Sequence, residues 1–396
     1  MKVLYLGYWP SGDGLTQSVI VPRLRILSEI NKIEEIFFCS IERNKEALLN
    51  LALPKVRQLF FQSKQKQNVL LTKLSDFNGL QALLAELLNH EDISLIICNS
   101  PLAGIEGYRL HKKNNIPFVV ECFEPHALYM HESGAWKRWD PRFLILSYYE
   151  SKQKKHAWRL ATVSEKYTTK LITEGVSQER IFTVPNCISL DEFKFDEAKR
   201  SAKRLELSIS SHSIVGIYVG KFGDIYYDEE AFDLFAEAFD FFGGDFWLII
   251  LSSASKQSVT EKLQKRNVMT DHLHVVQVAH EKVPDFLSAS DFAFSTIRPS
   301  PARSYCCPVK DGEYWANGLP ILLEDGIGDD SDIIKKEGGG IIINSGSRRA
   351  TFQQLLSWMK KGRATLAEEI FPIAVKHRRM EYLVNYYKRL FDQQGV

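Results

Sequence analysis

The chain lacks the cysteine pattern of a metal site or of a disulfide framework. It has no C-x-x-C pair and no Cys/His cluster with the spacing of metal ligands. Four of its six cysteines fall in or beside apolar runs. We therefore expect reduced thiols in a cytoplasmic protein. The six are Cys39, Cys98, Cys122, Cys187, Cys306 and Cys307.

Long apolar runs and an excess of charge of one sign are also missing. No stretch approaches the ~18 uninterrupted apolar residues that span a bilayer. The opening "MKVLYLGYWPSGDG" predicts a short strand and a turn rather than a leader peptide. The 50 basic and 49 acidic residues almost cancel, so composition gives no support to nucleic acid as a partner.

What the 396 residues do contain is an alternation of strand-like and helix-like segments. Short apolar runs separated by helical patterns are typical of parallel sheets covered by helices on both faces. In the first half, the predicted strands are 2–8, 34–40, 93–100, 117–123 and 180–186. In the second half they are 213–221, 246–253, 273–279, 291–297, 320–325 and 340–344.

A charged stretch without a strand, residues 187–211, separates the two sets of strands. We place the domain link there and predict two doubly wound α/β domains that face each other across a cleft. The expected boundaries are 1–190 for the first domain and 207–375 for the second. A C-terminal helix, 376–396, is expected to return to the first domain.

The stretch "CPVKDGEYWANGLPILLEDG" (307–326) predicts a short helix with unusual charges. Pro308 suits the N1 position, and Gly318 suits the position just past the helix end. Lys310 in the first turn opposes the helix dipole, which hints at an anionic ligand. Glu313, one turn on, is placed to accept hydrogen bonds from sugar hydroxyls. A solvated Lys–Glu pair at i, i+3 is the alternative.

This stretch resembles a motif of the family 4 retaining glycosyltransferases. The residues in register are Pro308, Lys310, Glu313, Tyr314, Ala316, Gly318, Leu319 and Pro320. The resemblance implies the GT-B fold, two Rossmann-like domains with a nucleoside diphosphate sugar of the UDP or GDP type as donor. It also implies transfer with retention and no metal or other cofactor. The expected acceptor is a glycan or a lipid-linked molecule.

The resemblance also assigns donor-site residues. Glu313 matches the glutamate that binds the ribose, and the helix start faces the diphosphate. In "YVGKFGDIYYDEE" (218–230), Lys221 takes the place of a cation that neutralises the leaving diphosphate. The alternative is that Lys221 is a solvent-exposed loop lysine without a functional role. The glycine-rich loop "GYWPSGDGLTQ" (7–17) is expected near the donor phosphate. The implied donor-binding residues are Gly12, Gly14, Lys221, Tyr305, Val309, Lys310 and Glu313.

Two positions depart from the family pattern. Tyr227 stands where a second cation is usual, so Lys221 would act with another cation such as Arg303 or Lys310. Tyr305 stands where a first glutamate normally touches the donor sugar. These departures support an alternative, a non-catalytic GT-B-like partner subunit. A Rossmann oxidoreductase is disfavoured because the first loop lacks G-x-G-x-x-G.

The first domain offers a histidine after a strand, in "VVECFEPHALYMHESGAW" (119–136). In the family, a histidine of this loop contacts the transferred sugar. His126 is the candidate catalytic residue, with Glu124 assisting and Lys221 completing the catalytic set. A capping or packing role is the alternative for His126, and His131 is a competing candidate.

Three other features of the sequence are a pair of turn and cap residues, an Asp-x-Asp pair and a segment rich in aromatics and cations. Ser164 predicts a helix N-cap, and Asn186 a turn into the linker. Asp330 and Asp332 form an Asp-x-Asp pair that we interpret as helix capping rather than as a metal site. Residues 131–159 mix aromatics with cations, which suits either a half-buried helix or contact with an anionic membrane surface from the cytoplasmic side.

Overall fold

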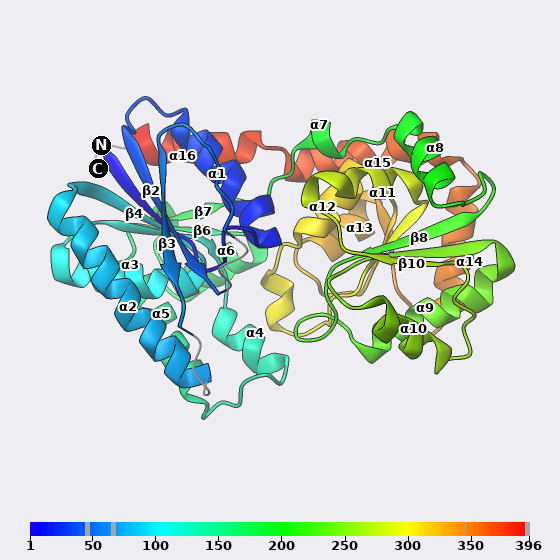
Figure 1. Ribbon diagram of the computed structural model, residues 1–396, viewed down its shortest axis with the longest axis horizontal. Coiled ribbons are helices and arrows are strands. Elements are labelled where there is room, and N and C mark those ends of the chain that lie inside the picture. Colours follow the sequence, from blue (N-terminus) through cyan, green and yellow to red (C-terminus); the bar gives the residue numbers. More distant parts are fainter. Residues whose placement is uncertain (44–47, 65–68, 345, 393–396) are drawn as a thin grey trace. The chain divides into compact units, whose positions relative to one another are not determined.

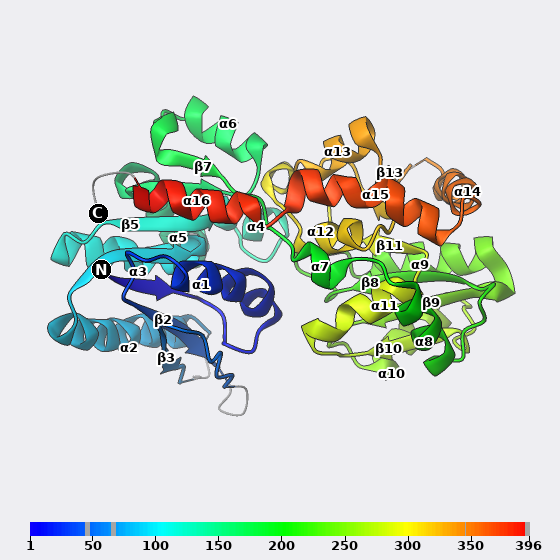
Figure 2. The same cartoon turned by 90° about the horizontal axis from the view of Figure 1, so that it is seen from above.

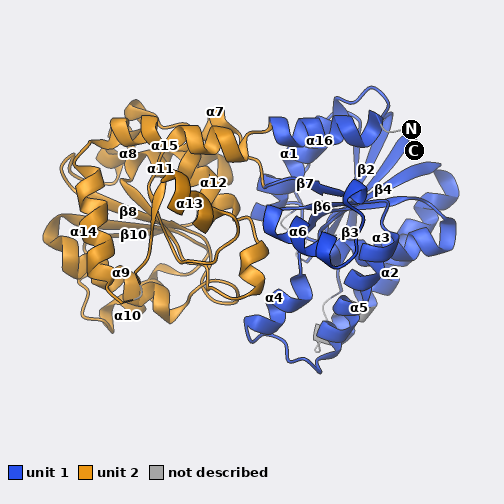
Figure 3. Ribbon diagram, turned by 180° about the vertical axis from the view of Figure 1, so that it is seen from behind, with its two compact units in different colours: residues 1–185, 381–396 blue, residues 186–380 orange. Residues whose placement is uncertain are grey.

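The computed structural model describes residues 1–43, 48–64, 69–344 and 346–392. Within it the chain forms two compact units, shown in different colours in Figure 3. Unit 1 comprises residues 1–185 and 381–396, and unit 2 comprises residues 186–380. Each unit is an α/β domain with its own parallel sheet.

Unit 1 is built on a seven-stranded sheet in the order β3-β2-β1-β4-β5-β6-β7. Every pairing is parallel. The strands are β1 (Lys2–Leu6), β2 (Glu35–Glu42), β3 (Val56–Gln62), β4 (Ile93–Asn99), β5 (Phe118–Phe123), β6 (Arg159–Thr162) and β7 (Ile181–Thr183). The helices are α1 (Val21–Ser28), α2 (Val69–His90), α3 (Ser100–Asn114), α4 (His126–Glu132), α5 (Pro141–His156), α6 (Glu165–Thr173) and α16 (Glu381–Asp392).

Helices cover both faces of this sheet, which explains why its central strands are apolar throughout. In Figure 1, α1 and α16 lie on one side of the strands and α2, α3 and α5 on the other. Val3, Leu4 and Tyr5 of β1 are all fully buried, as expected for a central parallel strand. The C-terminal helix α16 belongs to this unit, as Figure 2 shows from above, and the Lys32 ammonium donates to the Phe391 carbonyl at 2.6 Å.

Unit 2 repeats the plan with six parallel strands in the order β10-β9-β8-β11-β12-β13. The strands are β8 (Ile214–Val219), β9 (Phe246–Leu251), β10 (Leu273–Val276), β11 (Phe292–Ser295), β12 (Ile321–Leu323) and β13 (Gly340–Ile342). The helices are α7 (Leu190–Phe193), α8 (Glu197–Glu206), α9 (Glu229–Phe242), α10 (Lys256–Gln264), α11 (Val283–Ala289), α12 (Val309–Ala316), α13 (Asp330–Glu337), α14 (Arg348–Met359) and α15 (Arg363–Arg378).

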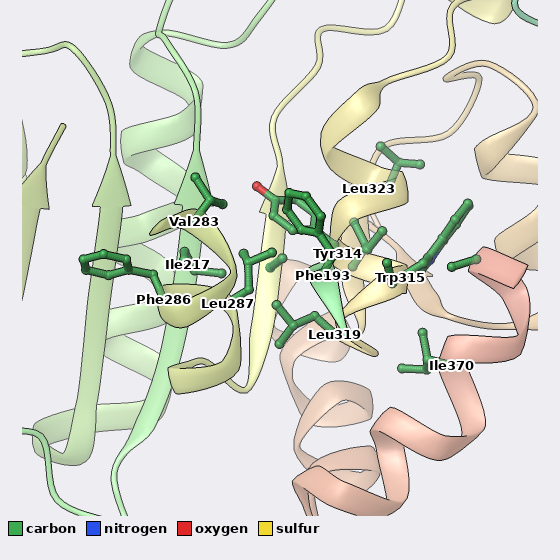
Figure 4. Packing of buried hydrophobic residues seen from close by; sticks show 14 of the residues in the cluster. Phe193, Ile217, Val283, Phe286, Leu287, Tyr314, Trp315, Leu319, Leu323 and Ile370 are labelled. Carbon is green, nitrogen blue, oxygen red and sulfur yellow. The ribbon is translucent and has the colours of Figure 1, made fainter. Parts of the chain in front are cut away.

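The side chains of alternate residues in the unit 2 strands pack into two separate hydrophobic cores, one on each face of the sheet. Ile217 and Ile249 point into the core beneath α11, α12 and α15, whereas Tyr218 and Ile250 point into the core beneath α9, α10 and α14. This is the period-2 alternation of a strand that is buried on both faces. Figure 4 shows the first of these cores, where Leu287 of α11 packs with residues of the helices around it.

The predicted fold class is confirmed, but the domain link lies earlier than expected. The units divide at Pro185–Asn186 and again at Met380–Glu381, not at 190–207 and 375–376. Residues 187–211 are not a linker, because α7 and α8 pack on unit 2. Arg200 and Arg204 of α8 both bind the Asp291 carboxylate, at 2.6 and 2.8 Å. These ion pairs account for the charge that suggested a linker.

Two strands of unit 1 were not predicted. β3 is a half-exposed edge strand rich in polar residues, "VRQLFFQ", and β6 has only four residues and follows directly on α5. Neither has the apolar run that marks a strand buried on both faces. All six cysteines are outside disulfides. Among the described helices, none is both long enough and apolar enough to cross a membrane.

Candidate functional site

The order of the unit 2 strands creates a switch point between β8 and β11. The chain winds one way from β8 to β9 and β10, and the other way from β11 to β12 and β13. Loops at the carboxyl ends of the two central strands therefore diverge, and doubly wound folds bind ligands there. The predicted donor residues Lys221, Tyr305 and Lys310 all lie in or directly after these loops.

Helix α12 lies between β11 and β12 and begins close to where the sequence placed it. Pro308 is the N-cap rather than the N1 residue, with an extended ψ of 125°. Gly318 has φ +66°, and a Cβ there would lie 2.3 Å from the Ala367 Cα. Only glycine combines that left-handed conformation with such close packing. The end of α12 is thus pressed against α15.

Lys310, in the first turn of α12, reaches across to the end of β8. Its ammonium lies 4.2 Å from the ring centroid of Tyr226. A Cβ added to Gly220 would lie 2.6 Å from the same ammonium. The adjacent backbone is also tied to α12, since the Tyr314 hydroxyl accepts from the Val219 N–H at 3.1 Å. The cation of α12 and the strand end that carries Lys221 are therefore neighbours.

Glu313 does not form a surface pair with Lys310. Its side chain is almost fully buried, and one of its carboxylate oxygens lies 2.7 Å from His280 Nε2. His280 follows β10, and its ring packs 5.4 Å from that of Phe193. Burial by itself would lower the pKa of His280, but the hydrogen bond and the charge of Glu313 raise it above its ordinary value. Sequence reasoning missed His280, although it follows a strand at the same sheet edge.

Lys221 and Tyr227 flank the loop that follows β8. The Lys221 side chain is 64% exposed and its ammonium is 3.7 Å from the Asp224 carboxylate, so it is available to an anion. The Tyr227 hydroxyl donates to Glu324 at 3.4 Å, and the Arg298 guanidinium lies 5.3 Å from the Tyr227 ring. Burial and the neighbouring Glu324 charge raise the pKa of Tyr227 to about 12, so this phenol stays neutral.

The segment before α12 is held by a buried polar cluster. The Asn186 side chain donates to the Cys307 carbonyl at 2.6 Å, and Arg378 binds both the Cys307 thiol and, at 2.5 Å, the Asp330 carboxylate. Burial, followed by the charge of Asp330, raises the pKa of Asp311 well above its ordinary value. The capping role expected for Asp330 is wrong: α13 has no side-chain cap, and the Asp330 carboxylate is instead buried against Arg378.

The remaining residues around this segment differ in exposure. The Arg303 side chain is buried, with only 3% of its surface exposed. Of the two further cations considered from the sequence, Lys310 is therefore the one that reaches the end of β8. Tyr305 ends a short turn at Ala302–Tyr305 and is half-buried. Val309 is the first residue of α12 and packs on the unit 2 core.

In unit 1, His126 begins α4 directly after the turn that follows β5. Its Nδ1 is 3.9 Å from a Glu124 oxygen, and both side chains are partly exposed. The buried Glu150 accepts from the Ala127 N–H at 2.9 Å, and burial raises the pKa of Glu150 to about 8. A buried carboxyl thus caps α4, and His126 is not needed for that purpose.

His131, the competing candidate, has a structural position. Its Nδ1 donates to the Trp136 carbonyl at 2.9 Å, and Arg138 Nε donates to its other ring nitrogen at 3.3 Å. Both ring nitrogens therefore hold the loop after α4. Of the two histidines, His126 is the one whose ring is left to meet a ligand within unit 1.

The loop with Gly12 and Gly14 follows β1 and leads into a π-helical turn, Thr16–Ile20. The Thr16 hydroxyl donates to the Pro10 carbonyl and the Gln17 amide to the Ser11 carbonyl, each at 2.7 Å. A Cβ on Gly14 would meet nothing within 4 Å. The loop is therefore closed by its own side chains, while Gly14 faces open space at the carboxyl edge of the sheet.

The sequence expectations for two structural residues are confirmed. The Ser164 side chain caps α6 by accepting from the Tyr167 N–H, and Asn186 fixes the turn out of unit 1 through Cys307.

The His280–Glu313 pair makes a testable contribution to stability. Because the folded pKa of His280 is raised above the ordinary 6.5, the pair stabilises fully below that pH and less as pH rises through the folded pKa. We expect the Tm difference between the wild type and His280→Gln to be largest near pH 6 and to shrink towards pH 9. The exposed His212 gives a matched control, His212→Gln. A Tm difference that stays constant over this range contradicts a charged pair.

Comparison with known proteins agrees with this architecture. Residues 54–192 match the model of Glycosyltransferase Family 4. No curated protein sequence matches. Solved structures match over nearly the whole chain, at low identity. Anabaena HepE, in complex with UDP and glucose, has 14% identity and a TM-score of 0.72 and is covered over 99% of both chains.

Two further structures have the same fold. Sucrose-phosphate synthase from Thermosynechococcus elongatus has 15% identity and a TM-score of 0.76, with 99% of this chain and 98% of that one covered. WaaG, a glycosyltransferase involved in lipopolysaccharide biosynthesis, has 13% identity and a TM-score of 0.73 over 100% of both chains. Residues 54–192 thus match the model of Glycosyltransferase Family 4, and the chain as a whole has the GT-B fold of these solved glycosyltransferase structures.

Proposed function

We propose that this enzyme transfers a sugar from a nucleoside diphosphate donor of the UDP type to a glycan or lipid-linked acceptor, with retention at the anomeric carbon. The observation that carries the proposal is the position of Lys310, whose ammonium lies beside the end of β8. This strand end is at the switch point of the sheet, where doubly wound folds bind their ligands. Anabaena HepE supports the choice of base, because that protein was solved with UDP and with UDP-glucose.

Each donor-site residue has a role in this proposal. The exposed Lys221 and the half-buried Lys310 neutralise the diphosphate together with the first N–H groups of α12. Glu313 accepts hydrogen bonds from the ribose hydroxyls, and His280 orients its carboxylate. Gly12 and Gly14 let the unit 1 loop come close to a phosphate, and Tyr305 and Val309 line the approach to α12.

The chemistry needs little beyond these charges. The bond between the anomeric carbon and the diphosphate oxygen breaks, and a bond forms between that carbon and the acceptor oxygen on the same face. The acceptor proton passes to the departing diphosphate, whose growing negative charge Lys221 and Lys310 stabilise. His126 contacts the transferred sugar and Glu124 assists its placement. Since protein groups supply the positive charge, the proposal requires no metal.

We place this reaction in the cytoplasm, with the enzyme in peripheral contact with the inner face of a membrane where its acceptor is lipid-linked. Nucleoside diphosphate sugars carry charge that keeps them in water, while a lipid-linked acceptor presents its glycan at the bilayer surface. An enzyme that uses both would work at that boundary.

A second candidate function is a non-catalytic partner subunit with the same fold. Its support is Tyr227, a neutral phenol held by Glu324 where the family has a cation, together with Tyr305 in place of an acid. Slow hydrolysis of the donor by the pure protein separates the two proposals, because only an active site cleaves the sugar–phosphate bond.

The base can be tested by thermal shift with UDP, GDP, ADP and CDP. A ligand present at 100 times its Kd stabilises the folded state by about 2.7 kcal/mol. We expect UDP to raise Tm most. A panel in which no nucleotide raises Tm contradicts the donor site.

Glu313→Gln should weaken UDP binding while the fold stays intact. The amide keeps the shape of the buried carboxylate and can still pair with His280, but it loses the charge that strengthens a hydrogen bond to ribose. We expect a loss of about 1.5–3 kcal/mol in UDP affinity by calorimetry. Glu206→Gln, at an exposed acid of α8, is the control. Unchanged affinity in Glu313→Gln removes Glu313 from the site.

Lys221→Ala should lower turnover far more than it weakens donor binding. Charge on the diphosphate grows in the transition state, so a cation at this place acts mainly on the barrier. We expect kcat to fall by about 10² to 10³, and Lys221→Arg to keep more activity than Lys221→Ala. Lys265→Ala, at an exposed lysine that ends α10, is the control. Equal losses in kcat and in donor affinity would indicate ground-state binding alone.

Transfer should survive incubation with excess EDTA, because Lys221, Lys310 and the start of α12 already provide positive charge for the diphosphate. The measurement is transfer to an acceptor, or donor hydrolysis, before and after chelation. Activity that disappears with EDTA and returns with Mg²⁺ or Mn²⁺ would show that a metal does this work.

A further inference from the structure

Helix α5 of unit 1 exposes an apolar surface where a surface helix normally exposes polar residues. Leu144, Ile145 and Tyr148 recur at helical spacing and are 55%, 40% and 54% exposed, and Trp139, just before the helix, is 74% exposed. The opposite face of α5 is buried through Leu146, Glu150 and Gln153. The outward stripe is thus not the core-facing side of an amphipathic helix. Exposed apolar patches of this kind mark binding surfaces.

Cations border these side chains. The Lys137 ammonium lies 5.4 Å from the Trp139 ring, and the Lys152 ammonium lies 5.1 Å from the Tyr148 ring. Arg138 is also exposed. We call these seven residues the α5 surface: Lys137, Arg138, Trp139, Leu144, Ile145, Tyr148 and Lys152. Lysine and arginine around exposed aromatic and aliphatic side chains match the layering of a bilayer, with headgroup charge outside and acyl chains within.

The acids of this segment do little to offset the positive charge. Residues 133–156 hold six Lys and Arg residues against two acids. Asp140 is bound by the Arg142 guanidinium at 2.6 Å. Glu150 is buried, and burial raises its pKa to about 8, so it is largely neutral at pH 7. The segment therefore presents net positive charge, which favours an anionic partner.

We propose that the α5 surface docks the enzyme on an anionic lipid bilayer. A second copy of the chain fits less well, because a two-fold contact would place the same cations against each other. The proposal deepens the proposed function and rests on it in one respect, the lipid-linked acceptor. Within unit 1 the surface continues into the loop of His126, whose ring centroid lies 6.5 Å from that of Trp136, and Trp136 packs with the core under α4.

The position of the surface is consistent with this role. Figures 1 and 3 show α4 and the loop that follows it at the lower edge of unit 1, and α4 packs against α5. Docking through this edge would bring the glycan of a membrane lipid next to His126, the residue assigned to the transferred sugar.

The test is flotation of the full-length protein with vesicles of phosphatidylcholine alone or with 30% phosphatidylglycerol. We expect binding to the anionic vesicles, weaker binding to the neutral ones, and loss of binding as salt rises. Lys137→Gln and Arg138→Gln should each weaken binding about fivefold. Trp139→Ser combined with Leu144→Ser should weaken it more than about tenfold, and Trp139→Phe should retain most of it.

The matched control is Leu205→Ser, at a leucine of α8 that is 81% exposed in unit 2; it should bind vesicles like the wild type. Absence of binding to anionic vesicles at low salt overturns the proposal, as does binding that the α5 variants leave unchanged. A concentration-dependent dimer that Trp139→Ser dissolves would assign the surface to a second copy and also overturns it.

UDP binding, measured by thermal shift without lipid, separates this proposal from the proposed function. It should be the same in the wild type and in the α5 variants. Vesicle binding without any nucleotide binding would remove the donor site and leave the docking surface, whereas nucleotide binding without vesicle binding would do the reverse.

Discussion

The close approach of the Lys310 side chain to the strand end at Gly220 is the constraint on which the candidate site of unit 2 depends. Gly220, the residue after β8, has φ +149°, a conformation that residues with a side chain rarely adopt, and a Cβ there would displace the Lys310 ammonium. The approach requires α12 to lie close to that strand end, which the Tyr314 hydroxyl and the Val219 N–H secure. A cation placed at a helix N-terminus is unfavourable for the helix itself. Its position is stabilised by the aromatic ring of Tyr226, which lies 4.2 Å from the ammonium.

The rest of unit 2 holds α12 in that place. The far end of the helix is fixed by Gly318 against Ala367, and the Trp315 indole donates to the Gly339 carbonyl at 2.9 Å. Ahead of the helix, Arg378 joins Cys307 and Asp330 in a fully buried cluster. Removing one partner of such a cluster leaves a buried charge uncompensated. The same cluster includes the last residue of α15, Arg378, and the Ile188 N–H donates to its carbonyl at 2.7 Å. The segments that enter and leave unit 2 are thus tied to the residues that directly precede α12.

Unit 1 uses buried polar groups in a comparable way, at the end of β5. Tyr5 and Arg23 both contact the buried Glu121 carboxylate, at 3.0 and 3.3 Å, and α16 packs on α1 over the same face of the sheet. The buried Glu150 carboxyl caps the start of α4 by accepting a hydrogen bond from the Ala127 N–H. The His126 loop is therefore supported on its inner side, and the outer side of α5 is left free to make the contact that its exposed aliphatic and aromatic side chains suit.

The sequence by itself determined the fold class, because buried parallel strands leave continuous apolar runs and helices between them leave a separate periodicity. It also predicted the bounds of α12 to within one residue, since Pro308 and Gly318 act through local backbone geometry. It did not reveal β3 or β6, whose residues are too polar or too few to stand out. It misplaced the domain link, because Arg200 and Arg204 of the charged stretch 187–211 form ion pairs with Asp291, which lies 91 and 87 residues further along the chain. The His280–Glu313 pair, the reach of Lys310 to Gly220 and the burial of Asp330 against Arg378 were likewise decided by the tertiary structure. Each joins residues distant in the chain, and only the packing of helices onto the sheet brings their side chains within hydrogen-bonding distance.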